Sequence, residues 1–251
     1  LDNPYFIKMS EKLIKAYEKY GYQVIITPIP NKTVTIKDIK RCILKNANLC
    51  VSFIELDKKA IDYAAKMNYS VILVGRHEQT NKLDMIYTND FAGGCLAAKH
   101  LLKSGAHKFL YISYDLAECS TRRFDGFNET IRKNGKNYLI EKIDAHDCKG
   151  IVEKIKSDGF DGIFIFNDAF ALKILECLLS QNVDLNNINF VGYDNTVQQF
   201  DVRTCNYSSI SANYNEIVKR IVDVTNTRLD INTQGSKKKK LELKVGLSII
   251  H

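Results

Sequence analysis

The chain has 251 residues, of which 45% are apolar and 26% charged, with 13 Gly and 3 Pro. This composition is typical of a globular protein and excludes collagen-like, disordered and coiled-coil structures. The 36 Lys and Arg exceed the 29 Asp and Glu by 7, which is too mild an excess to indicate nucleic-acid binding by itself. At this length one hydrophobic core commonly divides, so two subdomains are expected as readily as one.

The cysteines and the residues at the start of the chain are evidence for the cellular compartment of the protein. The number of cysteines, seven, is odd, and none form a Cys-x-x-Cys pair. Apolar or small neighbours surround Cys50, Cys95, Cys177 and Cys205, as is typical of reduced core cysteines, so we expect a reducing cytoplasm. The sequence contains no apolar run of membrane-spanning length, and residues 1–20 lack signal-peptide features. Leu1 is not a natural start, so we expect residues upstream of it.

Amphipathic helical segments alternate with short apolar segments along the chain. Residues Phe6, Met9, Leu13, Ile14 and Tyr17 share one face of the first predicted helix, which Gly21 ends. Further helices are predicted near 36–44, 60–67, 90–102, 120–134, 151–155, 168–179 and 214–224. Strands are predicted at 22–27, 49–54, 71–74, 85–87, 109–113, 139–143, 163–166, 188–191, 207–210 and 241–250.

This alternation predicts an α/β fold with two doubly wound lobes. Apolar strands separated by amphipathic helices indicate parallel sheets covered on both faces. The first lobe is predicted to span 1–114 with 211–232 crossing back, and the second to span 115–210 with a final strand at 241–251. A ligand is then expected in a cleft where the carboxyl ends of the two sheets face each other.

Several predicted strands end in polar residues at that cleft. Arg76, Asn167 and Asp194 each follow an apolar strand. A helix cap or turn is the alternative explanation, and it is favoured for Asp168, whose carboxylate directly precedes an apolar helix. Arg123 lies in the first turn of its helix, where a cation opposes the helix dipole, so it requires a partner. A ligand rich in hydroxyl groups would supply one.

Aromatic side chains would complete a sugar site by stacking on the apolar face of the ring. Tyr5 and Phe6 at the start of the first helix, together with His146 after the strand at 139–143, are the candidates. Core packing explains Phe6 equally well. The basic run Lys237 to Lys240 lacks interleaved aromatics and is expected to be a solvated hairpin.

Catalytic and metal-binding motifs are absent from the sequence. It has no Gly-x-Gly-x-x-Gly, Walker A, His-Glu-x-x-His or Gly-x-Ser-x-Gly pattern, and its five His show no metal-ligand spacing. Binding without catalysis is therefore predicted, with no catalytic residue, metal or cofactor.

Six short motifs occur in register across nearly the whole chain. They are Asn3-Pro4-Tyr5-Phe6, Asn89-Asp90 with Gly93-Gly94, residues 100–108, Arg123-Phe124-Asp125-Gly126-Phe127, residues 167–172 and Val191-Gly192-Tyr193-Asp194-Asn195. Their order and spacing resemble the effector-binding core of the LacI/GalR family of transcription regulators.

The resemblance implies two periplasmic-binding-protein-like lobes joined by three crossovers. It also implies a cytoplasmic homodimer that represses transcription in response to a small effector, usually a sugar, and binds operator DNA through a separate helix-turn-helix headpiece. Arg123, Asn167 and Asp194 match positions that hold the effector, and Tyr5 and Phe6 match positions that line its pocket. His146 aligns loosely with an aromatic that stacks on the ligand in some members, and the chain has no Trp.

The sequence departs from the family pattern at its start. The headpiece and the apolar first strand before Asn-Pro-Tyr-Phe are not in the sequence, and a sheet without that strand is expected to have unpaired edges. An extracytoplasmic sugar-binding protein of a transport system is the alternative function, with similar lobes. An α/β enzyme is disfavoured because no motif supports one.

Overall fold

The structure, a computed structural model, describes residues 3–29, 33–75, 81–114, 118–135, 139–196, 205–229, 242–245 and 247–250. These residues form two compact units, each made of discontinuous stretches of chain. Unit 1 comprises 1–88 and 213–245, and unit 2 comprises 89–212 and 246–251. The chain therefore passes between the units three times, as the family resemblance implied.

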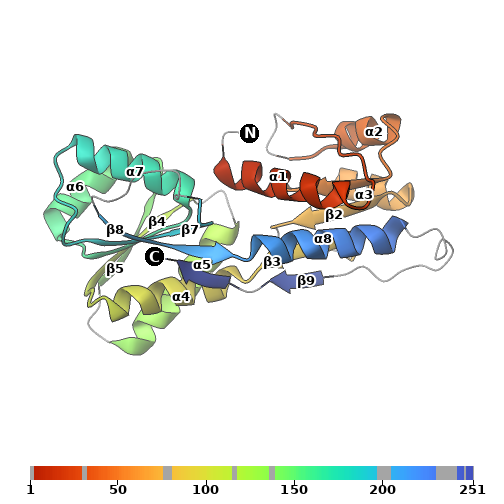
Figure 1. The fold of residues 1–251 in the computed structure, drawn as a ribbon. Helices are drawn as coiled ribbons and strands as arrows, with labels where there is room; N and C mark the ends of the chain where they lie inside the picture. The colour runs from red at the N-terminus through yellow and green to blue at the C-terminus, as the bar shows by residue number, and fades with distance from the viewer. Residues whose placement is uncertain are drawn as a thin grey trace. The chain divides into compact units, whose positions relative to one another are not determined.

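Unit 1 has a four-stranded parallel sheet in the order β1-β2-β3-β9 (Figure 1). Its elements are α1 (Pro4–Glu18), α2 (Ile36–Leu44), β1 (Leu49–Ser52), α3 (Lys58–Lys66), β2 (Ser70–Val74), β3 (Asp84–Thr88), α8 (Tyr214–Leu229) and β9 (Glu242–Val245). Helix α1 packs against α8, and α2 against α3. The predicted apolar face of α1 is confirmed, since Met9, Leu13 and Tyr17 are buried.

Unit 2 has a six-stranded sheet in the order β10-β8-β7-β6-β4-β5, parallel except for β10. Its elements are α4 (Asp90–Lys103), β4 (Lys108–Ser113), α5 (Glu118–Asn134), β5 (Leu139–Asp144), α6 (Cys148–Asp158), β6 (Gly162–Ile165), α7 (Asp168–Ser180), β7 (Asn189–Tyr193), β8 (Asn206–Ala212) and β10 (Leu247–Ile250). Figure 1 shows α6 and α7 on one face of this sheet and α4 and α5 on the other. The predicted α/β class is confirmed.

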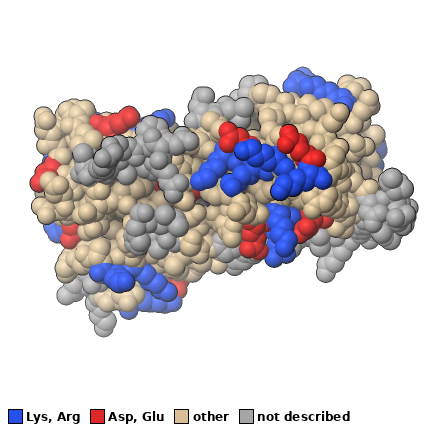
Figure 2. Space-filling view, viewed as in Figure 1, with Lys and Arg blue, Asp and Glu red and all other residues tan. Residues whose placement is uncertain are grey.

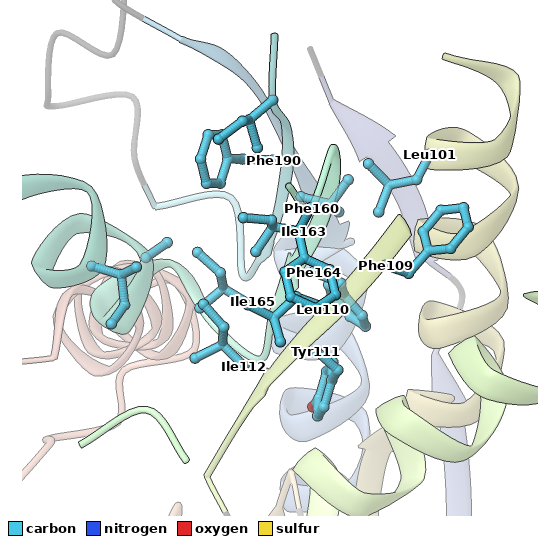
Figure 3. Packing of buried hydrophobic residues seen from close by; sticks show 14 of the residues in the cluster. Leu101, Phe109, Leu110, Tyr111, Ile112, Phe160, Ile163, Phe164, Ile165 and Phe190 are labelled. Carbon is cyan, nitrogen blue, oxygen red and sulfur yellow. The ribbon is translucent and has the colours of Figure 1, made fainter. Parts of the chain in front are cut away.

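The core of unit 2 is built from its central strands. Phe109, Tyr111, Phe164 and Phe190 are at most 1% exposed and lie among aliphatic side chains (Figure 3). Removing an aromatic side chain of this size from water stabilises a fold by roughly 1.5–3 kcal/mol. These residues hold β4, β6 and β7 rigidly, so the chain that follows each strand starts from a fixed position.

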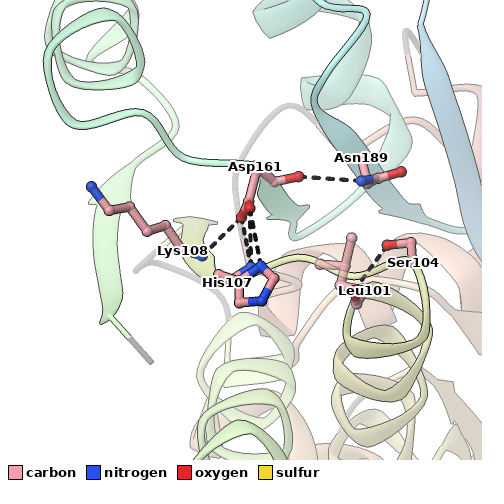
Figure 4. A network of polar contacts seen from close by, with 6 residues as sticks. All are labelled: Leu101, Ser104, His107, Lys108, Asp161 and Asn189. Carbon is pink, nitrogen blue, oxygen red and sulfur yellow. Dashed lines mark hydrogen bonds and ion pairs between the residues drawn. The ribbon is translucent and has the colours of Figure 1, made fainter. Parts of the chain in front are cut away.

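A polar network lies at the edge of this sheet where its parallel strands begin (Figure 4). The Asp161 carboxylate accepts hydrogen bonds from the backbone amides of His107 and Lys108 at 2.9 and 2.8 Å. The Asp161 carbonyl accepts one from the Asn189 amide at 2.9 Å. One residue thus ties together the starts of β4, β6 and β7.

Two sequence predictions about the lobes need correction. The predicted boundary after residue 114 lies too late, because β4 pairs with β5 and β6 and so belongs to unit 2. The single strand predicted at 241–250 is two strands. Its first half, β9, pairs with β3 in unit 1, and its second half, β10, pairs with β8 in unit 2.

The strand predicted at 22–27 is also wrong. Residues 22–29 form no ladder, and Val24, Ile25 and Ile26 are 38–52% exposed. Strand β1 lies at the sheet edge beside no strand other than β2 among the described residues, which agrees with the unpaired edge expected from the sequence. A β-branched segment forms a strand only where a partner supplies its hydrogen bonds, and this one has none in the described chain.

The structure also corrects the expectation for Cys177. It forms a disulfide with Cys148 between α7 and α6, with Cα atoms 6.7 Å apart. The apolar neighbours of Cys177 are real, since its side chain packs against the unit 2 core, but they do not prevent pairing with a cysteine on the adjacent helix.

The exposed surface of unit 1 mixes charges of both signs. In Figure 2, Lys and Arg side chains gather over α1 with Asp and Glu beside them. Helix α1 itself contains Lys8, Lys12 and Lys15 alongside Glu11 and Glu18, a pattern typical of a solvated face. The run Lys237 to Lys240 lies outside the described residues. No helix in the described part of the chain is long and apolar enough to cross a bilayer.

Candidate functional site

The carboxyl ends of four parallel strands lie at one edge of the unit 2 sheet. Strands β4, β5, β6 and β7 run in the same direction, so the residues that follow them share this edge. Those residues are Tyr114 after β4, Ala145 and His146 after β5, Phe166 and Asn167 after β6, and Asp194 and Asn195 after β7. Three of the predicted site residues, His146, Asn167 and Asp194, are therefore brought to one edge.

Arg123 reaches this edge from α5 and is 7% exposed. Its Nε donates to Oδ1 of Asp90 at 2.9 Å, and its Nη1 donates to the Phe166 carbonyl. Its guanidinium carbon lies 3.4 Å from the centre of the Tyr193 ring. The partner that the sequence required for Arg123 is thus supplied within the chain.

The charge of Arg123 is secured by its surroundings. Burial acts to lower the pKa of the guanidinium, but Asp90, with smaller contributions that include Asp194, raises it well above its usual value. A buried arginine with a carboxylate partner and a carbonyl acceptor is held in one orientation. It can therefore present its remaining N–H groups to a ligand without reorganisation.

The helices that open at this edge use Asn, not Asp, as the cap. Asn89 Oδ1 accepts from the Ala92 amide at 3.4 Å, and Asn167 Oδ1 accepts from the Phe170 amide at 2.9 Å. The cap that the sequence favoured for Asp168 is therefore wrong, and Asp90 is not the cap of its helix either. In both helices the amide side chain takes the capping position, and the following carboxylate turns into the protein interior.

Asp168 is fully buried in a polar network behind the edge. Its carboxylate accepts from the Thr196 amide at 2.6 Å, the Tyr207 hydroxyl at 2.7 Å and the Ser209 hydroxyl at 2.9 Å. Burial raises the pKa of Asp168, and these hydrogen bonds oppose that rise. The network fixes the turn after β7 against the start of α7.

Asp194 occupies a left-handed backbone conformation, with φ of 96°, and Asn195 follows with φ of 50°. Such values are uncommon for residues other than glycine and occur where surrounding contacts impose them. The Asp194 amide donates to the Ile210 carbonyl at 2.8 Å, and the Asn195 amide donates to Ser209 Oγ at 2.9 Å. Both side chains are half-buried.

An aromatic cluster lies beside these polar groups at the ends of β4, β5 and β6. Tyr114 stacks on Phe166 with ring centres 5.3 Å apart and lies 5.4 Å from His146 and 5.6 Å from Phe170. The His146 ring is 5.2 Å from Phe170, and its Nδ1 lies 2.9 Å from Asp144 Oδ1. With its side chain 61% exposed, His146 forms the outer part of the cluster.

Sequence reasoning missed Tyr114, Phe166 and Phe170 as candidate site residues. A signal was present, because Tyr114 and Phe166 directly follow buried strands, and Phe170 lies in the first turn of the helix that follows one. None of the three was named as a site residue, and each lies in or directly after an apolar run. The role of Asp90 was also missed, since a carboxylate at a helix start resembles a cap.

Tyr5 and Phe6 lie in unit 1, half-buried in a second aromatic cluster. Their ring centres are 5.4 Å apart; Tyr5 is 5.9 Å from Tyr214, and Phe6 is 6.1 Å from Phe53, which directly follows β1. The contact with Phe53 thus places Phe6 at the carboxyl end of β1, and Tyr5 lies between Phe6 and the start of α8. Arg76 lies outside the described residues. Within the described ranges, no group of three or more His, Cys, Asp or Glu side chains is arranged to hold a metal.

Sequence comparison with known proteins finds transcriptional repressors among the relatives of this chain. No family profile matches the chain. The chain is 22% identical over 207 residues to the HTH-type transcriptional repressor PurR of Mannheimia succiniciproducens, in an alignment covering 77% of this chain and 62% of that protein. It is 24% identical over 240 residues to the sucrose operon repressor of Lactococcus lactis, covering 92% and 73% respectively. The chain thus spans about three fifths of the first relative's length.

Solved structures match the whole fold. A LacI family transcriptional regulator from Enterococcus faecium with bound ribose superposes with a TM-score of 0.80 at 16% identity, covering 100% of this chain and 94% of that one. The chain is thus similar in sequence to these two repressors and shares its fold with this LacI family regulator.

Proposed function

We propose that the chain is the effector-binding and dimerisation core of a cytoplasmic transcriptional repressor that responds to a sugar. One observation carries the proposal: Arg123, fixed by Asp90 and the Phe166 carbonyl, lies at the same sheet edge as the aromatic cluster of Tyr114, His146 and Phe170. Fixed planar donors beside aromatic rings are the groups that bind hydroxyls and the apolar face of a sugar ring.

The predicted effector-binding residues enter this proposal with different roles. Arg123, Asn167 and Asp194 would hold hydroxyl groups, and His146 would stack on the ligand. Tyr5, Phe6 and Arg76 are the predicted effector-binding residues of unit 1. Because Asn167 already accepts the Phe170 amide through Oδ1, its side-chain NH₂ is the group offered to a ligand hydroxyl.

The repressor is proposed to act without catalysis, as a homodimer on operator DNA bound through a headpiece. Effector binding would shift an equilibrium between conformations by its difference in affinity for them. Both relatives described above are repressors, which favours this function over the alternative of an extracytoplasmic sugar-binding protein. Light scattering tests the dimer, since a monomer at micromolar concentration would contradict that part.

The proposal predicts that a sugar stabilises the native chain. A ligand that binds the native state alone raises the melting temperature by mass action, with about 2.7 kcal/mol gained at one hundred times its Kd. The measurement is a thermal-shift screen with neutral mono- and disaccharides, sugar phosphates and purines. A hit among the sugars supports the proposal. A hit restricted to purines replaces the effector class, and no hit at all contradicts small-molecule sensing.

Two histidines provide a matched pair of variants for that screen. His146 and His107 each have a ring Nδ1 near an aspartate and are 61% and 76% exposed, but they lie at opposite edges of the unit 2 sheet. His146→Ala is expected to weaken sugar binding about 10-fold, because it removes a ring from the aromatic cluster, and His107→Ala is expected to leave it unchanged. Calorimetry measures both. Equal affinities for the two variants would show that the aromatic cluster is not the site.

A further inference from the structure

The positive charge of Arg123 is compensated within the protein. The Arg123 and Asp90 side chains are 9% and 2% exposed, and Arg123 Nε donates to Asp90 Oδ1 at 2.9 Å. The other acceptor of the guanidinium is the uncharged Phe166 carbonyl, and one face of the guanidinium lies over the Tyr193 ring. The Arg123–Asp90 pair therefore offers N–H groups to a ligand without offering a net positive charge.

The helix starts at the same edge of the unit 2 sheet are also unsuited to an anion. The amino end of a helix commonly binds phosphate, because its free N–H groups and the helix dipole attract negative charge. Each of α4, α5, α6 and α7 has a carboxylate at its cap or in its first turn, namely Asp90, Glu118, Asp147 and Asp168. The Asp147 carboxylate itself caps α6 by accepting the Gly150 amide at 2.9 Å. A phosphate group that approached any of these helix starts would meet a negative charge.

The remaining charges at this edge do not reverse that balance. Asp144 ends β5, and the half-buried Asp194 directly follows β7. Lys173 Nζ lies 5.4 Å from the centre of the Phe170 ring, but the Lys173 side chain is exposed and solvent screens its charge. Among the described residues of unit 2, Arg123 is the only buried cation. The described part of this edge therefore carries an excess of negative charge.

We propose that the effector site selects uncharged sugars over their phosphate esters, and that Asp90 is the residue that sets this selection. The inference rests on the proposed function and names the class of its effector. A sugar hydroxyl both donates and accepts, so it can use the fixed N–H groups of Arg123 and the carboxylate of Asp194. A phosphate ester brings about two negative charges, which would lose their hydration beside carboxylates and an arginine that is already paired.

Matched pairs of ligands provide the first test. The thermal-shift screen is extended to glucose and glucose 6-phosphate, fructose and fructose 1-phosphate, ribose and ribose 5-phosphate, and sucrose and sucrose 6-phosphate. Calorimetry then gives the Kd of each compound that binds. The sugar is expected to bind about 10-fold or more tightly than its phosphate ester, because the ester adds an uncompensated charge to a desolvated site.

The outcomes of this test separate the selection from the proposed function. A phosphate ester that binds as tightly as its sugar, or more tightly, would overturn the selection and leave a sugar-responsive repressor in place. If no member of any pair binds, the proposed function fails, and the selection that rests on it fails with it.

Asp90→Asn tests the residue that is assigned to the selection. The amide keeps the size of the side chain and an oxygen that can accept from Arg123 Nε, but it removes the negative charge. Arg123 would then offer a net positive charge, so the ratio of sugar affinity to phosphate-ester affinity is expected to fall about 10-fold. A purely structural role of Asp90 would weaken the binding of both ligands together. An unchanged ratio would therefore overturn the assignment of Asp90.

Asp168→Asn is the matched control. Asp168 occupies the same position in α7 as Asp90 in α4, directly after the capping Asn, and it is also buried. Its carboxylate accepts from Thr196, Tyr207 and Ser209, so the variant leaves the Arg123–Asp90 pair intact and should keep the wild-type ratio.

Circular dichroism shows whether each variant is folded. If Asp90→Asn does not fold, the ligand pairs measured on the wild-type chain still decide the selection. Equal changes of the affinity ratio in Asp90→Asn and Asp168→Asn would overturn the assignment, because the selection would then follow the total charge of the edge and not the partner of Arg123.

Discussion

At the starts of α4 and α7, an asparagine and the aspartate that follows it have different roles. In each pair the Asn side chain caps the helix, which leaves the next carboxylate available for a distant partner: Arg123 for Asp90 and the turn after β7 for Asp168. The local sequence pattern predicts that a polar residue caps the helix. It does not show which of two adjacent polar residues is the cap when both side chains can accept the hydrogen bond. The choice depends on contacts 28–41 residues away in sequence. For this reason the sequence predicted which residues lie at this edge of the sheet better than it predicted the contacts that they make.

The pKa of Asp168 predicts a pH-dependent effect of Asp168→Asn. Burial raises the pKa above its ordinary value of 3.8, so the native state retains a proton at pH values where the unfolded chain has lost it. The stability that this carboxyl contributes is greatest below pH 3.8 and falls as the pH rises through the native pKa. The difference in unfolding free energy between wild type and Asp168→Asn is therefore expected to shrink from pH 3.5 to pH 7.

Denaturant titrations at several pH values measure this difference. The variant should also be less stable throughout, by about 1–3 kcal/mol, because one amide oxygen cannot replace two carboxylate oxygens as acceptors. A difference that grows with pH would contradict the assignment.

Glycines allow helices α4 and α5 to cross in close contact. A Cβ added at Gly94 would lie 1.9 Å from the Arg123 carbonyl oxygen, and one added at Gly126 would lie 1.9 Å from the Phe91 carbonyl oxygen. Each helix thus packs a glycine against the backbone of the other. This approach positions Arg123 next to Asp90, so the geometry of the candidate site depends on residues that have no side chain.

Gly94→Ala is therefore expected to destabilise the protein. In an isolated helix this change would stabilise by about 1 kcal/mol, but here the new methyl group meets a backbone carbonyl that cannot rotate away. Overpacking of this kind should cost about 2 kcal/mol or more. Lys99→Ala, on the exposed side of the same helix, is the control and should change stability by less than about 0.5 kcal/mol. Chemical denaturation compares them, and a neutral Gly94→Ala would show that the helices can separate freely.

At the scale of the whole molecule, apolar periodicity predicted the α/β class and most elements, since helices and buried parallel strands have different repeats. It could not predict which sheet each strand joins, because pairing is a property of distant segments. The division at Asn89 and the split between β9 and β10 both follow from pairing, and so does the failure of 22–27 to form a strand.

Removing residues 246–251 is expected to destabilise unit 2 selectively. The deletion removes β10, exposes the edge of β8, and takes away Leu247, which packs against the unit 2 core. Hydrogen exchange should accelerate for the amides of β7 and β8 by at least 10-fold and remain nearly unchanged for β2 and β3. Equal acceleration in both units would show that they unfold as one cooperative body.

The order in which the strands leave the ribosome follows from the three passages between units. Residues 242–250 follow all the other described strands and contribute one strand to each sheet, so neither sheet is complete until this segment has been synthesised. Until then the nascent chain exposes the hydrogen-bonding edges of β3 and β8. Both sheets are therefore completed by the same segment, and the interval before it is synthesised is the stage at which protection by a chaperone would matter most.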